Sequence, residues 1–338
     1  MSDSDTVPPS DAVQSNDTQI IDAPFPFNRA TADVILRSSD RVDFRVRRGI
    51  LAEASGFFED MFQLPQPAVG RSLEETRDAL PIVDMEEDSS TLERLLRLCY
   101  PGNTPKIEDL DDLRPVIRAA VKYDMPQVLD TLKGDLRSFA DAYPVRVYAL
   151  ALVFKFEDEV RVAAKSFLAF PVESADAREL AEITGKQFND LLKYHRACSA
   201  KATPVANNPS SWAQQTDVWF TAAKSHGATA SCQRSALGNC VASSWWTNYM
   251  IGSAAIVKTT PSGKALLVDG RTDVALREAA TCAICKYSAL EQMRRFVRQF
   301  AQKVDEAVAE VRLLGSVLPQ TCITNSRTDR LSPGSLRH

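Results

Sequence analysis

The fold of the N-terminal third of this 338-residue chain is decided by the stretch Ala32-Asp33-Val34-Ile35-Leu36-Arg37, Ser38-Ser39-Asp40, Val42-Asp43-Phe44-Arg45-Val46. The first run is short, apolar and rich in β-branched residues, and the second is a cluster of turn-forming residues. In the third run Val42, Phe44 and Val46 alternate with polar residues, which is typical of a strand with one buried face. Together the three runs predict a β-hairpin.

Helical signals follow the hairpin. Ser55 is a candidate helix N-cap between two apolar clusters, which are Ile50-Leu51 and Phe57-Phe58-Met61-Phe62. Residues 64–80 contain Pro and Gly and predict a loop, and residues 80–85 predict a short strand. From residue 88 onward apolar residues recur with a period of 3.6, which predicts a series of helices.

Four segments of residues 31–139 resemble the BTB/POZ domain in their order and spacing. They are Ala32-Asp33-Val34-Ile35-Leu36, the run from Phe44 to Phe58, Leu95-Leu96-Arg97-Leu98-Cys99-Tyr100-Pro101-Gly102, and Ala119-Ala120-Val121-Lys122-Tyr123-Asp124-Met125. One position departs from the family pattern, because a frequent histidine is Arg47 here. The wider arrangement is similar to a large group of fungal BTB proteins of unknown role. The resemblance implies an α+β fold in which a small sheet is flanked by helical hairpins.

The resemblance also implies a function. BTB domains self-associate, and many recruit cullin-type ubiquitin ligases or transcriptional co-regulators, so we expect a homodimeric interaction protein or adaptor without a catalytic site. By resemblance, Asp33 and Arg47 would line a charged pocket at the dimer interface, and the apolar Phe57, Phe58 and Met61 would contribute to that interface. The residues themselves leave another interpretation open, in which Asp33 caps a turn and Arg47 extends over the core.

The sequence pattern predicts six segments along the chain. These are a disordered acidic tail (1–27), the BTB/POZ domain (28–142), a helical extension (143–200), a linker-like segment (201–215), a C-terminal helical domain (216–318) and a disordered tail (319–338). We therefore expect an α+β domain followed by an all-helical C-terminal region.

Charge and composition restrict the classes of partner. The net charge is −4, and residues 1–28 hold five aspartates and no Lys or Arg, so the remaining 310 residues carry about +1. A nearly neutral body disfavours generic nucleic-acid binding. Neither a signal peptide nor a membrane-spanning stretch is expected. We expect an intracellular protein, in the cytoplasm or nucleus, that binds itself and other proteins but neither nucleic acid nor membrane.

Cys282 and Cys285 have the Cys-x-x-Cys spacing of metal ligands. A structural zinc site usually needs four nitrogen or sulfur ligands. Candidates for the remaining ligands are His195, Cys198, Cys232 and Cys240. Two alternatives stay open, namely thiols buried in a helical core and a redox pair, neither of which requires a cofactor. A metal- or thiol-dependent enzyme built around Cys282 and Cys285 is the alternative function.

Near the C-terminus, apolar residues recur at alternating steps of three and four. The series is Leu290, Met293, Val297, Phe300, Val304, Ala307, Val311 and Leu314. It predicts a helix over 290–314 with a coiled-coil-like seam. The seam could pack within the same chain or could form a second self-association surface.

Overall fold

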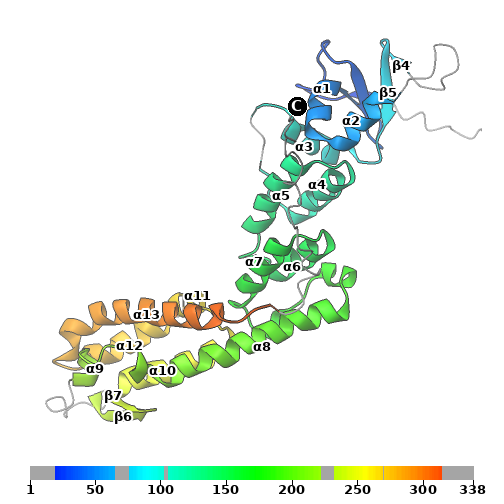
Figure 1. Ribbon diagram of the computed structural model, residues 1–338. Helices are drawn as coiled ribbons and strands as arrows, with labels where there is room; N and C mark the ends of the chain where they lie inside the picture. Colours follow the sequence, from blue (N-terminus) through cyan, green and yellow to red (C-terminus); the bar gives the residue numbers. More distant parts are fainter. Residues whose placement is uncertain (1–19, 65–75, 103–105, 222–231, 269, 314–338) are drawn as a thin grey trace, which may run out of the picture. The chain divides into compact units, whose positions relative to one another are not determined.

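The computed structural model describes residues 20–64, 76–102, 106–221, 232–268 and 270–313. It divides the chain into two compact units, residues 1–138 and residues 139–338. Figure 1 shows the sheet in the first unit and long helices in the second. The expected C-terminal tail 319–338 and residues 1–19 of the expected N-terminal tail lie outside the described residues. Among the described helices, none is long and apolar enough to cross a membrane.

A five-stranded mixed sheet forms one layer of the N-terminal unit, with the strand order β1-β3-β2-β5-β4. β2 and β3 pair in antiparallel fashion, as the sequence predicts, and β5 lies parallel to β2 on its other side. The strands are β1 (Ile21–Asp22), β2 (Val34–Arg37), β3 (Val42–Val46), β4 (Thr76–Arg77) and β5 (Leu80–Asp84).

Five helices complete the N-terminal unit. Ser55 ends the first helix and caps the second, because its hydroxyl accepts the backbone N–H of Phe58 at 3.1 Å. The predicted N-cap is thus confirmed. The helices are α1 (Arg48–Ala54), α2 (Gly56–Gln63), α3 (Ser89–Cys99), α4 (Leu110–Lys122) and α5 (Pro126–Ser138). Sheet and helices together confirm the α+β expectation.

The prediction of a disordered tail through residue 27 is wrong for residues 20–27. Ile21 and Asp22 form β1, which pairs in parallel with the edge of β3. The Phe27 side chain is fully buried, and its ring lies 5.7 Å from that of Phe44 and 5.3 Å from that of Tyr100. Residues 20–27 are mostly apolar, unlike the residues before them, and the buried Phe27 ring together with an open strand edge holds the segment in place.

An ion-pair network lies inside the sheet. Arg37 on β2 and Asp43 on β3 face each other in the strand register, and their side chains are 1% and 0% exposed. Two hydrogen bonds of 2.7 and 3.1 Å join the guanidinium to the carboxylate, and Arg77 adds another of 2.6 Å. Burial opposes the ionised carboxylate, but the two arginines outweigh it and lower the pKa of Asp43. Asp43, which lies on the face of β3 that the sequence pattern marks as polar, is therefore buried like the apolar residues of the opposite face.

The C-terminal unit is predominantly helical, as expected, with one two-stranded hairpin that the sequence did not predict. In Figure 1 the long helix α8 runs beside α10 and α13. The helices are α6 (Pro144–Val153), α7 (Glu157–Phe167), α8 (Gly185–Asn207), α9 (Val218–Thr221), α10 (Ser244–Thr259), α11 (Gly263–Leu267), α12 (Arg271–Ala280) and α13 (Cys285–Ala309). Three 3₁₀ turns are η1 (Val172–Ser174), η2 (Arg178–Glu182) and η3 (Pro209–Ser211), and the hairpin is β6 (Arg234–Leu237) with β7 (Cys240–Ser243).

Aromatic rings fill the core of the C-terminal unit. Trp219 and Trp246 stack with their ring centroids 6.0 Å apart, and both meet Phe296 of α13 edge-on at 5.5 Å. Trp212 stacks on Phe296 at 5.3 Å. Such pairs contribute about 0.5–1.5 kcal/mol each beyond their buried area. The aromatic stretch of the sequence therefore forms core rather than surface.

The prediction of a linker-like segment over residues 201–215 is wrong for residues 201–207. Residues 201–207 continue helix α8, and Pro204 lies inside this helix. Ala202 and Ala206 are fully buried in the core of the unit. Packing of these small residues offsets the hydrogen bond that a proline removes from a helix interior.

The seam of the last helix is buried within its own unit. Helix α13 covers Cys285–Ala309, so it begins earlier and ends earlier than predicted, and Leu314 lies outside the described residues. Phe300 and Val304 are fully buried in the core, whereas Leu290 at the start of the predicted series is 49% exposed. The structure therefore supports the intramolecular interpretation of the seam.

Candidate protein-interaction site

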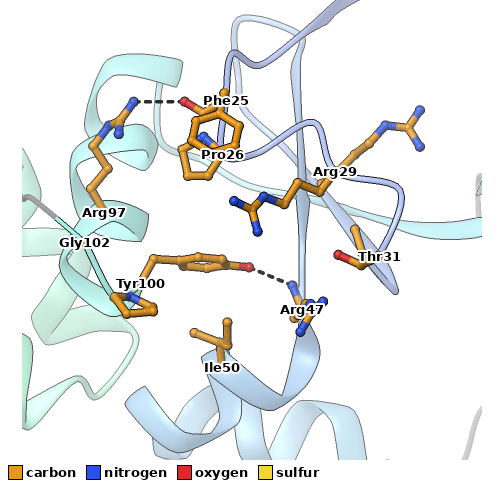
Figure 2. A pocket seen from close by; sticks show the side chains of 12 residues that line it. Phe25, Pro26, Arg29, Thr31, Arg47, Ile50, Arg97, Tyr100 and Gly102 are labelled. Carbon is orange, nitrogen blue, oxygen red and sulfur yellow. Dashed lines mark hydrogen bonds between the residues drawn. The ribbon is translucent and has the colours of Figure 1, made fainter.

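A pocket of about 460 Å³ opens in the N-terminal unit (Figure 2). It lies where the segment before β2 meets the beginning of α1 and the end of α3. We call it the arginine pocket. Its lining residues are Phe25, Pro26, Arg29, Thr31, Ala32, Arg45, Arg47, Ile50, Arg97, Tyr100, Pro101 and Gly102.

Tyr100 fixes the shape of the arginine pocket. It follows α3 directly, and its hydroxyl accepts the backbone N–H of Arg47 at 2.9 Å, which ties the end of α3 to the beginning of α1. Arg97, one turn earlier, donates to the backbone carbonyl of Phe25 at 3.4 Å. Both bonds are visible in Figure 2. Burial raises the pKa of Tyr100, so its hydroxyl stays protonated at neutral pH.

Four arginines and no acidic residue line the arginine pocket. Arg97 is paired with Glu93 at 2.6 Å, and Arg45 is paired with Asp22 and Asp78. Among the described residues, no carboxylate lies within ion-pair distance of Arg29 or Arg47.

Arg29 is directed into the arginine pocket in Figure 2, and its guanidinium lies 4.8 Å from the centroid of the Phe25 ring. The Phe25 side chain itself is 64% exposed. The pocket thus combines an excess of positive charge with an accessible aromatic surface.

Of the two charged residues singled out in the sequence, Arg47 lines the arginine pocket and Asp33 does not. The carboxylate of Asp33 accepts the backbone N–H of Arg48 at 2.7 Å, at the beginning of α1. Arg47, the N-cap residue of α1, makes no side-chain cap of its own. Asp33 therefore caps the N-terminus of α1 rather than a turn, whereas Arg47 is exposed at the pocket and does not extend over the core.

The predicted apolar interface residues divide between core and surface. Phe58 is 1% exposed and stacks on Tyr123 at 5.2 Å, so it is a core residue that a partner cannot reach. Met61 is half-buried. Phe57 is 44% exposed, and its ring lies 5.3 Å from that of Tyr123. Phe57 is therefore the accessible member of the three.

Cys282 and Cys285 lie in the C-terminal unit, in and after the turn between α12 and α13. Their sulfur atoms and that of Cys232 all lie within 4.8 Å of one another, and all three residues are buried. Burial would raise the pKa of Cys282, but the backbone N–H groups of Ile284 and Cys285 outweigh it and lower that pKa. Burial and the sulfur of Cys232 raise the pKa of Cys285.

His195 and Cys198 are placed elsewhere and do not join this group. The Nε2 atom of His195 lies 3.0 Å from the backbone carbonyl of Phe170, and burial lowers the pKa of the imidazole. Cys198 is fully buried on α8, and burial raises its pKa to about 11. Among the candidates for the remaining ligands, it is Cys232 that the fold brings to Cys282 and Cys285.

Sequence reasoning did not single out Phe25, Arg29 or Arg97 as site residues. Phe25 and Arg29 fell within or next to the segment expected to be disordered, and Arg97 was one polar residue on an amphipathic helix. A signal was present nonetheless, because the aromatic residues of 25–27 are unusual for a disordered tail.

Comparison with known proteins agrees with this geometry. No curated protein matches the chain. The family model of the BTB/POZ domain matches residues 26–139, which cover strands β2 to β5, helices α1 to α5 and the lining of the arginine pocket except Phe25. Residues 26–139 therefore form a BTB/POZ domain and, because BTB/POZ domains bind proteins, act as a protein-interaction module.

Proposed function

We propose that this chain is an adaptor whose BTB/POZ domain binds an acidic segment of a partner protein in the arginine pocket. The observation that carries the proposal is the excess of positive charge there. Arg29 and Arg47 line the pocket, and no described carboxylate pairs with either guanidinium. Hydrogen bonds from arginine to carboxylate are among the stronger polar contacts, at about 1.5–3 kcal/mol each.

The shape and lining of the pocket favour a peptide over nucleic acid. The cavity is small and concave, and Phe25, Pro26 and Ile50 provide apolar surface beside the arginines. An acidic peptide with apolar residues satisfies both kinds of surface. A nucleic-acid duplex needs an extended basic face, whereas this chain has a net charge of −4 and the pocket offers four arginines.

The partner classes follow from the family. BTB domains bring partners to cullin-type ubiquitin ligases or to transcriptional co-regulators, and we propose that this chain does the same inside the cell, in the cytoplasm or nucleus. The chain then acts by binding rather than by catalysis. Proteins recovered with the full-length chain, but not with a variant of the arginine pocket, would identify the partner.

Reversing both charges, with Arg29→Glu and Arg47→Glu in one variant, should weaken acidic-peptide binding at least tenfold. Two charge-assisted hydrogen bonds are lost, at about 1.5–3 kcal/mol each, and two carboxylates now repel the ligand. The measurement is fluorescence polarisation of a labelled peptide that alternates glutamate and leucine, with the full-length chain.

Arg118→Glu is the matched control, since Arg118 is an exposed arginine of α4 outside the arginine pocket. It should bind the peptide as the unchanged chain does, and affinity should fall as salt is added. A peptide with lysine in place of glutamate should not bind. Equal binding of both peptides, or a single-stranded oligonucleotide that binds more tightly than either, would contradict the proposal.

We also propose that the domain self-associates through the surface around Phe57. This residue is 44% exposed on α2, and Val121, near the end of α4 and two residues before Tyr123, is 46% exposed. Exposed apolar side chains of this size are common at protein interfaces. Self-association gives the adaptor two copies of the arginine pocket.

A dimer is therefore the expected state of the full-length chain at micromolar concentration, and Phe57→Glu should shift it toward the monomer. The introduced carboxylate would have to be buried without a partner at the interface. Light scattering coupled to size-exclusion chromatography gives the mass. Val162→Glu, which places the same carboxylate on an exposed apolar residue of the C-terminal unit, should leave the dimer intact. If the unchanged full-length chain has the mass of a monomer at micromolar concentration, the self-association proposal is wrong.

A further inference from the structure

Three thiols from distant parts of the chain converge in the C-terminal unit. Cys232 precedes strand β6, whereas Cys282 lies in the turn between α12 and α13 and Cys285 begins α13. The three residues are 3%, 3% and 0% exposed, their sulfur atoms lie within 4.8 Å of one another, and the sulfurs of Cys232 and Cys285 are 3.6 Å apart. We call these residues the cysteine triad.

The dimensions of the cysteine triad fit a tetrahedral metal ion. A zinc–thiolate bond is about 2.3 Å long, so two sulfurs on one tetrahedral zinc ion are about 3.8 Å apart. The sulfurs of Cys232 and Cys285 are 3.6 Å apart and no two sulfurs of the triad are more than 4.8 Å apart, which is compatible with that value. Small side-chain rotations would bring all three sulfurs to one ion.

The local backbone also suits thiolate ligands. Cys282 lies in the turn that separates two helices, and the backbone N–H groups of Ile284 and Cys285 face its sulfur. Hydrogen bonds of this kind offset the negative charge of a metal-bound thiolate and fix its orientation.

We propose that Cys232, Cys282 and Cys285 bind one Zn²⁺ ion through three thiolates. Soft sulfur ligands select zinc over magnesium or calcium. The fourth coordination position is open to water or to another ligand from outside the triad. Bound zinc would fasten the segment before the β6–β7 hairpin to the turn before α13 and would stabilise the C-terminal unit, because metal-binding free energy adds to folding free energy.

The test begins with the full-length chain, expressed with zinc in the medium and purified without chelators. Elemental analysis should find one zinc per chain, and a strong chelator should lower the melting temperature followed by tryptophan fluorescence. Cys232→Ser, Cys282→Ser and Cys285→Ser should each weaken zinc binding at least tenfold.

Two other buried thiols of the same core provide matched controls. Cys198 and Cys240 belong to the aromatic core cluster but lie outside the cysteine triad. Cys198→Ser and Cys240→Ser should therefore retain one zinc per chain. Loss of zinc from either control, with zinc retained in the triad variants, would overturn the assignment.

A second test uses the unchanged chain, so it does not depend on whether the cysteine variants fold. Cobalt exchanged for zinc should give a sulfur-to-cobalt charge-transfer band with the intensity of three thiolates and a tetrahedral visible spectrum. Copper in place of zinc, a disulfide between Cys232 and Cys285 found by mass spectrometry, or alkylation of the three thiols that added zinc does not slow would each overturn the proposal.

Discussion

Replacing Asp43 by asparagine is expected to destabilise the N-terminal unit by about 3–5 kcal/mol. The substitution keeps the shape of the side chain but leaves the fully buried guanidinium of Arg37 without its counter-charge. It also weakens the bond to Arg77. Domains have about 5–15 kcal/mol of stability in total, so this single change removes a large share. Denaturant unfolding followed by circular dichroism gives the free energy.

Asp78→Asn is the matched control for Asp43→Asn. Asp78 also pairs with an arginine, Arg45, but its side chain is 63% exposed, and exposed ion pairs contribute about 0–1 kcal/mol. Hydrogen exchange should show that Asp43→Asn, and not the control, loses protection over residues 34–46. Equal effects of the two substitutions would show that the buried network does not stabilise the sheet.

The same network predicts the response to acid. The folded-state pKa of Asp43 is lowered, because the two arginines outweigh the effect of burial. A carboxylate with a lowered pKa contributes stability that is fully present above its unfolded-state pKa of about 3.9 and is lost as the pH falls through the folded-state value. The unchanged chain should therefore lose stability below about pH 4 more steeply than Asp43→Asn does.

Val304→Asp is expected to destabilise the C-terminal unit by more than about 4 kcal/mol, or to unfold it. Val304 is fully buried on α13, so the new carboxylate enters an apolar core without a partner. Burial would raise the pKa of this carboxylate, and the loss of stability should grow as the pH rises above about 4. All four tryptophans lie in the C-terminal unit, so their fluorescence reports its unfolding.

Leu290→Asp on the same helix provides the comparison. Leu290 is 49% exposed and belongs to the same three-and-four series in the sequence, so its substitution should change stability by less than about 1 kcal/mol. Light scattering on Val304→Asp tests the alternative of an intermolecular seam. A variant that stays folded but loses mass would show that the seam joins two chains.

Local patterns were enough to predict most of the N-terminal unit. Alternation at Val42, Phe44 and Val46 predicts β3 because side chains of a strand alternate between its faces, and Ser55 separates α1 from α2 because a serine hydroxyl can satisfy a helix N-terminus. The order of these elements resembles one family, and the family model matches the same region. Each of these signals depends on residues a few positions apart.

The same patterns failed where distant residues decide the structure. Asp43 lies on the polar side of its strand pattern, yet it is buried because Arg37 and Arg77 reach it. Pro204 and its polar neighbours suggest a linker, yet α8 continues through them because its small residues pack in a core.

The candidate sites show the division between sequence and tertiary structure. By itself the sequence determined that this chain carries a protein-interaction domain and a Cys-x-x-Cys pair. Only the tertiary structure decided that Arg29 joins Arg47 in one pocket and that Cys232, rather than Cys198, completes the cysteine triad. The physical reason is that spacing along the chain specifies local backbone and burial, whereas convergence of distant side chains depends on how whole elements pack.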